Sequence, residues 1–305
     1  MAEKDITEKN LEALNDVFAD IVNVLLFKGE QVINEKDLEA DTTKSMFKAD
    51  GKIHEQERDV SKFWKNGEIR ISILGIENQT AQDSDMPLRV ISYDGASYKQ
   101  QLLDKNQKKR YPVATLVLYF GTEEKWSKAK HLYDCFEIPE KLKPFVNDYK
   151  INVFNIAFLS QKTIAMFKSD FKIIAEYFRA KRLNQKYKGS KEKLKHANET
   201  LKMFSALTGD NSFEKVYNES NFKKGGITMC DVVKRIRDDG RTEGITEGIN
   251  KGILEGRIEG RTEEQERIIM NLIESNAGTI EQIAAWVKLP VKEVQKIAKK
   301  VPVNA

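Results

Sequence analysis

The sequence predicts an α/β fold, in which a mixed sheet is flanked by helices, followed by an all-α extension at the C-terminus. A continuous apolar run at residues 113–121 (VATLVLYFG) is typical of a central strand buried on both faces. Apolar residues recur at helical spacing over residues 7–27. From Gly240 onward glycines recur every four residues, which marks a change in composition. We therefore expect one domain at residues 1–230 and a second segment at residues 231–305.

The first helix is expected at residues 7–27, where one apolar face is repeated every three or four residues. Gly29 stands where a helix of this length would stop, because glycine readily adopts the backbone conformation that ends helices. The acidic residues 34–43 are expected to form a loop or a short helix.

A β-hairpin is expected next. Asn66-Gly67 is a strong hairpin signal, and it separates a polar segment at residues 52–60 from an apolar one at residues 69–79. If these segments pair, Asp59 and Glu77 lie on neighbouring antiparallel strands.

The remaining elements of the first domain alternate between helix and strand. Residues 86–103 read as a helix, residues 151–159 as a further strand, and residues 163–204 as lysine-rich helices. The basic stretch at residues 185–196 fits a solvated surface or a patch that contacts phosphates.

Composition excludes several classes of function. A net charge of +4 permits DNA as a partner without arguing for it. The three histidines and the distant Cys135 and Cys230 show no zinc-ligand spacing, so the thiols are expected to be inert. No apolar run is long enough to cross a membrane, and the expected compartment is the cytoplasm.

Three residues carry the candidate chemistry: Asp59, Glu77 and Gln79. Side chains two positions apart on a strand point the same way, so Glu77 and Gln79 share a face that Asp59 can join from the neighbouring strand. Adjacent carboxylates repel unless a cation neutralises them, and Mg²⁺ prefers oxygen ligands. Such a metal serves phosphodiester hydrolysis. The same spacing also occurs on ordinary exposed strands, so spacing alone leaves both interpretations open.

Several motifs together resemble the Rpn family of recombination-promoting nucleases and putative transposases, which belongs to the PD-(D/E)xK superfamily. The resemblance spans roughly residues 10–230 and includes a strand that carries Glu-x-Gln, followed by Met, Arg and Tyr on the next helix. The matching residues are Asn15-Asp16, Asp59, residues 75–80 (GIENQT), Asp83, Asp85-Met86, Leu88-Arg89, Tyr93 and residues 111–121. The resemblance implies a restriction-endonuclease-like core.

Carried over residue by residue, the resemblance implies that Asp59 and Glu77 bind Mg²⁺, with Asp16 of the first helix as a further ligand. Asp20 lies one turn along the same helix face and could replace Asp16. Gln79 occupies the place of the superfamily's lysine, as in other Rpn proteins. A glutamine amide offers only a neutral hydrogen bond, so slow turnover is plausible.

Three flanking residues have alternative roles. Arg89 either contacts a DNA phosphate or pairs with Asp85 one turn earlier. Tyr93 is expected to pack with its hydroxyl satisfied rather than to stack on a base. His54 is expected to be an exposed strand residue.

The C-terminal glycines need a physical explanation. A four-residue repeat drifts by roughly 40° per step around an α-helix, and six helical glycines cost roughly 5 kcal/mol relative to alanine. Close approach to a second helix would compensate, which predicts a homo-oligomer; a semi-flexible linker is the alternative. The glycines are Gly240, Gly244, Gly248, Gly252, Gly256 and Gly260.

The last segment, residues 279–298, resembles a small helix-turn-helix unit. Thr279 and Gln282 form a capping box that starts its first helix. The second helix could present Lys292, Gln295 and Lys296 to DNA, or the hairpin could serve packing alone.

These observations lead to three hypotheses. The first is a Mg²⁺-dependent DNA endonuclease, linked by the resemblance to recombination or mobile elements. The second is a protein that keeps the nuclease fold but acts as a DNA-binding or oligomerisation module. In the third, the C-terminal segment controls the nuclease by self-association or by covering its site.

Overall fold

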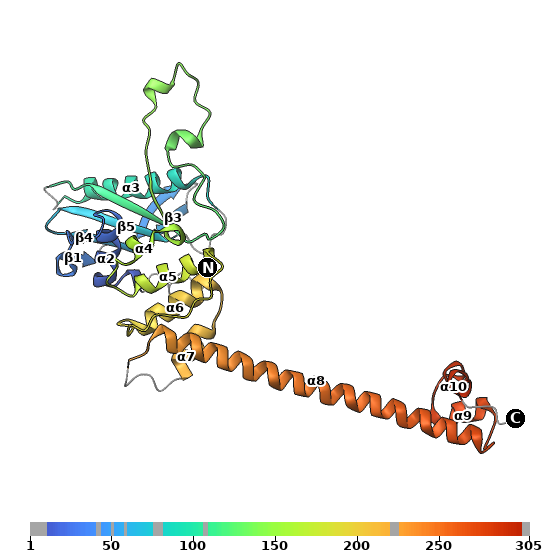
Figure 1. The fold of residues 1–305 in the computed structure, drawn as a ribbon. Helices are drawn as coiled ribbons and strands as arrows, with labels where there is room; N and C mark the ends of the chain where they lie inside the picture. The colour runs from blue at the N-terminus through green and yellow to red at the C-terminus, as the bar shows by residue number, and fades with distance from the viewer. Residues whose placement is uncertain are drawn as a thin grey trace. The chain divides into compact units, whose positions relative to one another are not determined.

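The computed structural model describes residues 11–40, 44–49, 52–57, 60–75, 82–105, 109–219 and 226–300 (Figure 1). The chain divides into two compact units, Met1–Ile236 and Arg237–Ala305. Within the described part, none of the helices is both long and apolar enough to pass through a bilayer.

A five-stranded mixed sheet forms the centre of the first unit. In the order β1-β4-β5-β6-β7, β4 is antiparallel to both β1 and β5, and β5, β6 and β7 are parallel to one another. The expected mixed α/β architecture is therefore confirmed. The strands are β1 (Leu38–Ala40), β4 (Val60–Trp64), β5 (Ile69–Gly75), β6 (Val113–Tyr119) and β7 (Asn152–Asn155).

The hairpin at Asn66-Gly67 is confirmed, but its first strand is not the one expected. β4 pairs with β5, with Val60 opposite Ile73, whereas Lys52–Glu57 (β3) pairs with Lys44–Ala49 (β2) in a separate two-stranded sheet. The prediction of one strand at residues 52–60 is thus wrong. The reason is that the segment before Val60 finds its partner in β2, so β4 begins only at Val60 and buries Ser61 and Lys62 in the main sheet.

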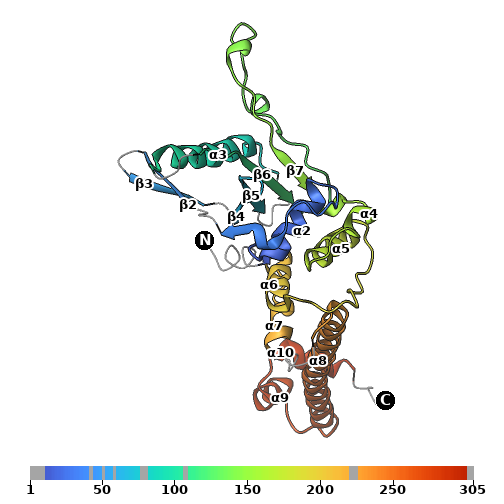
Figure 2. The ribbon, with the colours of Figure 1, turned by 90° about the vertical axis from the view of Figure 1, so that its left-hand side faces the viewer.

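The central strand β6 is buried on both faces, as its apolar run predicts. Leu116 and Leu118 belong to the main core, which includes residues of α2 (Asn15–Leu25) and α5 (Phe171–Arg182). Val117 and Tyr119 point the other way and pack with Met86 and Val90 of α3 (Met86–Leu103). Helices therefore cover both faces of the sheet (Figures 1 and 2).

A buried polar layer joins α3 to the sheet. Asp94 of α3 is 1% exposed and accepts hydrogen bonds from Thr115 Oγ1 at 2.7 Å and from the Tyr149 hydroxyl. Arg70 of β5, also buried, donates to Ser97 Oγ at 3.0 Å. These contacts fix the register of α3 above β5 and β6.

Replacing Asp94 with alanine is expected to lower the free energy of unfolding by about 3 kcal/mol, because the buried hydroxyl of Thr115 and the partly buried hydroxyl of Tyr149 lose a charged acceptor. Chemical denaturation of the full-length protein measures this change. Lys99→Ala, at an exposed position of the same helix, is the matched control and should stay within about 0.5 kcal/mol of wild type. Equal midpoints for both variants would contradict a structural role for Asp94.

Two other predictions need correction. The apolar run at residues 151–159 is a strand only at β7, and continues as a 3-10 helix (η4, Ile156–Phe158). Both Ile156 and Ala157 are fully buried, which a helical turn achieves by packing successive residues into one core. Residues 163–204, expected to be helical, are interrupted by the basic stretch at residues 185–196, which is irregular and in which Lys193 forms an isolated β-bridge with Thr228.

The first helix ends close to where the sequence predicts, but it begins at Asn15 rather than at residue 7, because a turn and a bend at residues 13–14 separate it from the helical residues 11–12. Within the described residues it spans Asn15–Leu25, and Gly29 follows with a φ of 91°, the left-handed conformation that glycine favours. A Cβ at Gly29 would also lie 2.9 Å from Met166 Sδ. The remaining helices of the first unit are η1 (Glu35–Asp37), η2 (Leu132–Cys135), η3 (Lys143–Phe145), α4 (Gln161–Ile164), α6 (Ala197–Thr208) and α7 (Ser212–Glu219).

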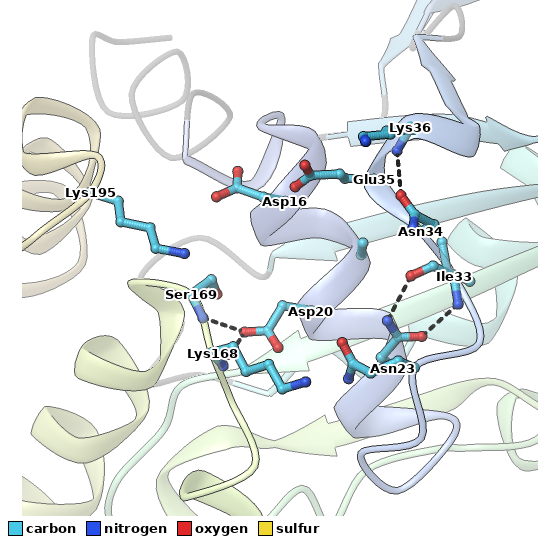
Figure 3. A pocket seen from close by; sticks show the side chains of 12 residues that line it. Asp16, Asp20, Asn23, Ile33, Asn34, Glu35, Lys36, Lys168, Ser169 and Lys195 are labelled. Atoms are coloured by element: carbon cyan, nitrogen blue, oxygen red, sulfur yellow. Dashed lines mark hydrogen bonds between the residues drawn. The ribbon is translucent and has the colours of Figure 1, made fainter.

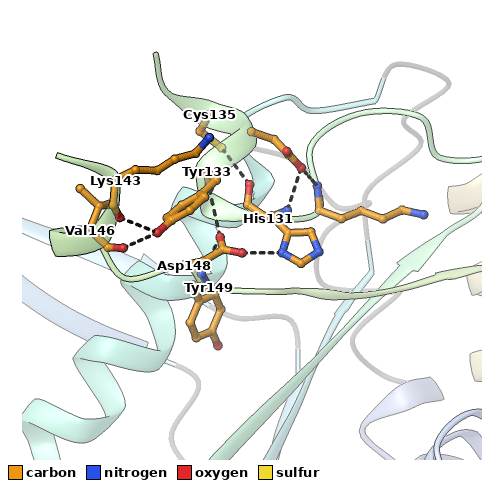
Figure 4. Close-up of polar contacts among 9 residues, drawn as sticks. His131, Tyr133, Cys135, Lys143, Val146, Asp148 and Tyr149 are labelled. Carbon is orange, nitrogen blue, oxygen red and sulfur yellow. Dashed lines mark hydrogen bonds and ion pairs between the residues drawn. The ribbon is translucent and has the colours of Figure 1, made fainter. Parts of the chain in front are cut away.

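A long excursion between β6 and β7 carries η2 and η3, and polar contacts close its base (Figure 4). His131 Nδ1 lies 2.6 Å from Asp148 Oδ2, and the Tyr133 hydroxyl donates to the Lys143 carbonyl at 3.0 Å. Partial desolvation raises the pKa of Asp148, but hydrogen bonds from the Tyr133 and Tyr149 N–H groups and from His131 outweigh it and lower the pKa overall. These contacts join the outgoing and returning arms of the excursion.

The C-terminal region is helical, as expected. Helix α8 (Met229–Glu274) is followed by α9 (Ile280–Val287) and α10 (Val291–Ala298). The capping box of Thr279 and Gln282 is confirmed. Ile269 near the end of α8 packs with α9 and α10 in a small separate core.

Candidate functional site

The open end of the β4–β5 hairpin is where the sequence places the candidate active site. Val60, the first residue of β4, pairs with Ile73, so the chain enters β4 beside the point where β5 ends at Gly75. Asp59 directly precedes this strand in the sequence, and Glu77 and Gln79 follow β5 by two and four residues. These three residues, like the side chain of His54, lie outside those that the structure describes.

The third candidate metal ligand, Asp16, lies at the start of α2. Its Oδ2 atom is 2.8 Å from Nε2 of His196, a residue 180 positions away, and both side chains are about a quarter exposed. A sequence pattern cannot reveal this contact because the partner comes from a distant segment.

Asp20, one turn along α2, has a different partner. It is only 6% exposed, and its Oδ2 atom accepts hydrogen bonds from the backbone N–H groups of Lys168 at 2.9 Å and Ser169 at 2.7 Å. These two residues directly precede the N-terminal end of α5. Its Oδ1 atom is buried and has no hydrogen-bond partner among the described residues.

The carboxylate of Asp170 likewise accepts hydrogen bonds from two consecutive backbone N–H groups. These groups belong to Lys195, at 3.2 Å, and His196, at 2.7 Å, next to the start of α6. Asp20 and Asp170 thus tie α2 to the start of α5, and α5 to the start of α6. This arrangement also holds His196 beside Asp16.

A pocket of about 400 Å³ opens along this acidic face of α2 (Figure 3). It has no lining residue from the strands β4, β5 or β6 among those that the structure describes. Its lining contains acidic, basic and amide side chains in similar numbers. The lining residues are Asp16, Ala19, Asp20, Asn23, Gln31, Ile33, Asn34, Glu35, Lys36, Lys168, Ser169 and Lys195.

The described residues do not by themselves make a metal centre. Within these ranges no group of three or more His, Cys, Asp or Glu side chains is placed to hold an ion. Mg²⁺ needs several oxygen ligands, and Asp16 and Asp20 are already engaged by His196 and by backbone N–H groups. A magnesium site in this protein therefore has to include ligands beyond these two.

Arg89 does not pair with Asp85, which corrects one of the two roles considered for it. Its guanidinium lies 3.0 Å from Oδ2 of Asp83, and the side chain is 48% exposed. Partial burial lowers the pKa of Arg89, but hydrogen bonds to Asp83 and Tyr93 outweigh this effect and raise it overall. Tyr93 packs against the core under α3 with its hydroxyl engaged, as expected.

The candidate DNA-contacting residues of the C-terminal segment share one face of α10. Lys292, Gln295 and Lys296 are exposed, whereas Val294 and Ile297 of the same helix are buried against α8 and α9. A three-residue turn with Lys288 in the left-handed conformation separates the two short helices. The second helix of the unit thus presents only polar side chains to solvent at these positions.

Sequence reasoning missed the residues opposite α2. His196 and Lys195 come from the basic stretch at residues 185–196, and Lys168 comes from residues that were expected to be helical. The only available signal was the pair Asp16 and Asp20 on one helix face, which indicates a polar partner without identifying it.

Comparison with known families tests the resemblance independently. Residues 64–209 match the family described as putative transposase, YhgA-like. This range contains Glu77, Gln79 and Arg89, and begins at the last residue of β4. No curated protein matches the chain in sequence, and no solved structure matches it. The resemblance is thereby confirmed: over residues 64–209 this chain matches the transposase family described as YhgA-like.

Proposed function

We propose that this protein is a Mg²⁺-dependent endonuclease that hydrolyses DNA phosphodiester bonds in transposition or recombination. Asp59 and Glu77 would bind the metal, and Gln79 would donate a hydrogen bond to the reacting phosphate. The observation that carries the proposal is the β4–β5 hairpin, whose open end brings Val60 opposite Ile73; β5 lies within the family-matched residues 64–209, and Val60 lies four residues before them.

The chemistry follows from the residue types. When bound, Mg²⁺ activates water and stabilises negative charge on a phosphoryl oxygen. Asp59 and Glu77 supply the oxygen ligands that this ion prefers. Gln79 is neutral, so it can orient a water or a phosphate oxygen without adding positive charge. Turnover slower than that of enzymes with lysine at this position is the expected consequence.

A plasmid cleavage assay tests the proposal directly. Full-length protein should nick or linearise supercoiled DNA in the presence of Mg²⁺, and EDTA should stop the reaction. Ca²⁺ in place of Mg²⁺ controls for a metal that only supports binding. Absence of Mg²⁺-dependent products over a wide range of protein concentration would count against the nuclease.

A second candidate is a DNA-binding and assembly module that retains the fold without catalysis. The exposed polar face of α10, with Lys292, Gln295 and Lys296, favours it. Calorimetry separates the two: a catalytic site binds Mg²⁺ in a manner that depends on Asp59 and Glu77, whereas an assembly module binds DNA equally well without them.

We also propose that α8 pairs with α8 of a second copy. Every residue from 237 to 264 is exposed, and a Cβ at any of the six repeat glycines would meet nothing within 4 Å. Large apolar side chains accompany the glycines, each about half exposed. Glycine rows let two helix axes approach closely, which offsets their poor helix propensity. The exposed apolar residues are Ile245, Ile249, Ile253, Leu254 and Ile258.

Charge favours a parallel pair. The residues that follow the glycines form a row of Arg and Ile, and the residues that precede them form a mainly acidic row on the other side. In a parallel pair the row on one side of the seam faces the opposite row of the partner, as in parallel coiled coils. Arginines then meet carboxylates, whereas an antiparallel pair would bring each row against itself. The following row is Arg241, Ile245, Ile249, Ile253, Arg257 and Arg261; the preceding row is Asp239, Glu243, Glu247, Lys251, Glu255 and Glu259.

A further inference from the structure

The pocket on the acidic face of α2 is built from segments far apart in the sequence, and it carries charges of both signs (Figure 3). Asp16, Asp20 and Glu35 supply three carboxylates, and Lys36, Lys168 and Lys195 supply three ammonium groups. A pocket of about 400 Å³ is within the size range of sites for small organic ligands, which begins near roughly 300 Å³.

The Asp20 carboxylate is the most specific feature of this pocket. The side chain is 6% exposed, and one oxygen is fixed by the N–H groups of Lys168 and Ser169. The other oxygen, Oδ1, has no hydrogen-bond partner among the described residues. A buried acceptor without a partner costs about 1–3 kcal/mol, and more when it is charged. Oδ1 is closed to solvent, so a ligand N–H reaches it, and recovers this free energy, after a small shift of the side chains beside it.

The surrounding polar groups restrict what else such a ligand can carry. The Asn23 side-chain amide already forms hydrogen bonds with the backbone of Val32 and Ile33, so it forms part of the pocket wall rather than a site for the ligand. Lys36, Lys168 and Lys195 are exposed, and none forms an ion pair with a residue that the structure describes. Lysine ammonium groups of this kind attract phosphate or carboxylate groups.

We propose that this pocket binds a small molecule that carries an N–H donor, directed at Asp20, and an anionic group, held by lysines of the lining such as Lys195. A nucleoside monophosphate with an amino-bearing base has this chemistry and a size suited to the cavity. A free amino acid shares the chemistry but would fill less of the space. Among the described residues the pocket has no lining residue from β4 or β5, and the groups used here are Asp20 and the lysines rather than Asp59 or Glu77.

Calorimetry on the full-length protein, in EDTA so that the nuclease metal does not contribute, tests the proposal. The probes are dCMP, deoxyribose 5-phosphate, deoxycytidine and glutamate. We expect dCMP to bind at least about tenfold more tightly than the sugar phosphate or the nucleoside, a difference in binding free energy of about 1.4 kcal/mol. The reason is that each of these two probes lacks either the N–H donor or the phosphate. Glutamate binding that depends on Asp20 would support the same chemistry and assign it to an amino acid.

Variants identify the residues. Asp20→Asn keeps an acceptor for the N–H groups of Lys168 and Ser169 but replaces the second oxygen with a donor, so it should weaken dCMP binding about tenfold. Lys195→Ala should weaken it without affecting folding. Lys181→Ala, an exposed lysine of α5 outside the pocket, is the matched control and should bind as wild type. Failure of both dCMP and glutamate to bind, or binding unchanged in both Asp20→Asn and Lys195→Ala, would overturn the proposal even if DNA cleavage is observed.

Discussion

Replacing Asp59 with alanine is expected to reduce Mg²⁺-dependent DNA cleavage by at least about 10³-fold, and Glu77→Ala should do the same. Each carboxylate would be a metal ligand, and loss of one leaves the ion too weakly held to stabilise charge on the phosphate. The measurement is the rate of plasmid nicking at saturating protein, with the thermal unfolding midpoint of each variant recorded in parallel.

Glu137→Ala is the matched control, because it removes one exposed carboxylate from the excursion between β6 and β7. It should cleave DNA at the wild-type rate. Gln79→Lys adds an ammonium group beside the proposed metal site and should raise turnover. A wild-type rate in Asp59→Ala, with the fold intact, would remove the metal-centre proposal and leave the DNA-binding module as the better account.

The sequence predicts those elements whose local pattern agrees with their tertiary environment. Helix α3 has the bounds expected from its periodicity, and β6 was recognisable because both of its faces are buried. β4 was placed too early, at residues 52–60, although it spans Val60–Trp64 and includes Lys62, which is buried in the sheet with its pKa lowered by desolvation. Burial of this kind depends on the partner strands, which a local pattern does not contain.

The surroundings of α2 illustrate the same limit for a functional site. Asp16 and Asp20 can be placed on one helix face from their spacing, but their partners lie in segments 148 to 180 residues away. Asp20 was expected to be interchangeable with Asp16. Instead its carboxylate caps the segment before α5, and Asp16 alone contacts His196. Helical spacing identifies neighbours on one element, whereas the role of each residue is set by the element packed against it.

Substitutions in the glycine row of α8 are expected to have a large effect on both helix stability and self-association. Changing all six repeat glycines to alanine should stabilise an isolated helix by roughly 5 kcal/mol, because no Cβ would meet another atom. If the row is the seam between two copies, the same methyl groups push the helix axes apart and dissociate the pair. We therefore expect the six-alanine variant to retain more helix than wild type as the temperature rises. Its dimer dissociation constant, measured by analytical ultracentrifugation, should nevertheless be at least about tenfold higher.

The opposite side of α8 supplies the matched control. Alanine at Thr242, Thr246 and Asn250 also raises helix propensity but leaves the glycine row untouched, so the pair should persist. Truncation after Ile236 should yield a monomer, since Val232 and Ile236 stay with the core of the first unit. If the six-alanine variant gains stability while its oligomeric state equals that of wild type, the glycines do not form a seam. The repeat would then act as a linker. At fully exposed helical positions, alanine differs from glycine in its effect on assembly only if a partner helix has to approach closely.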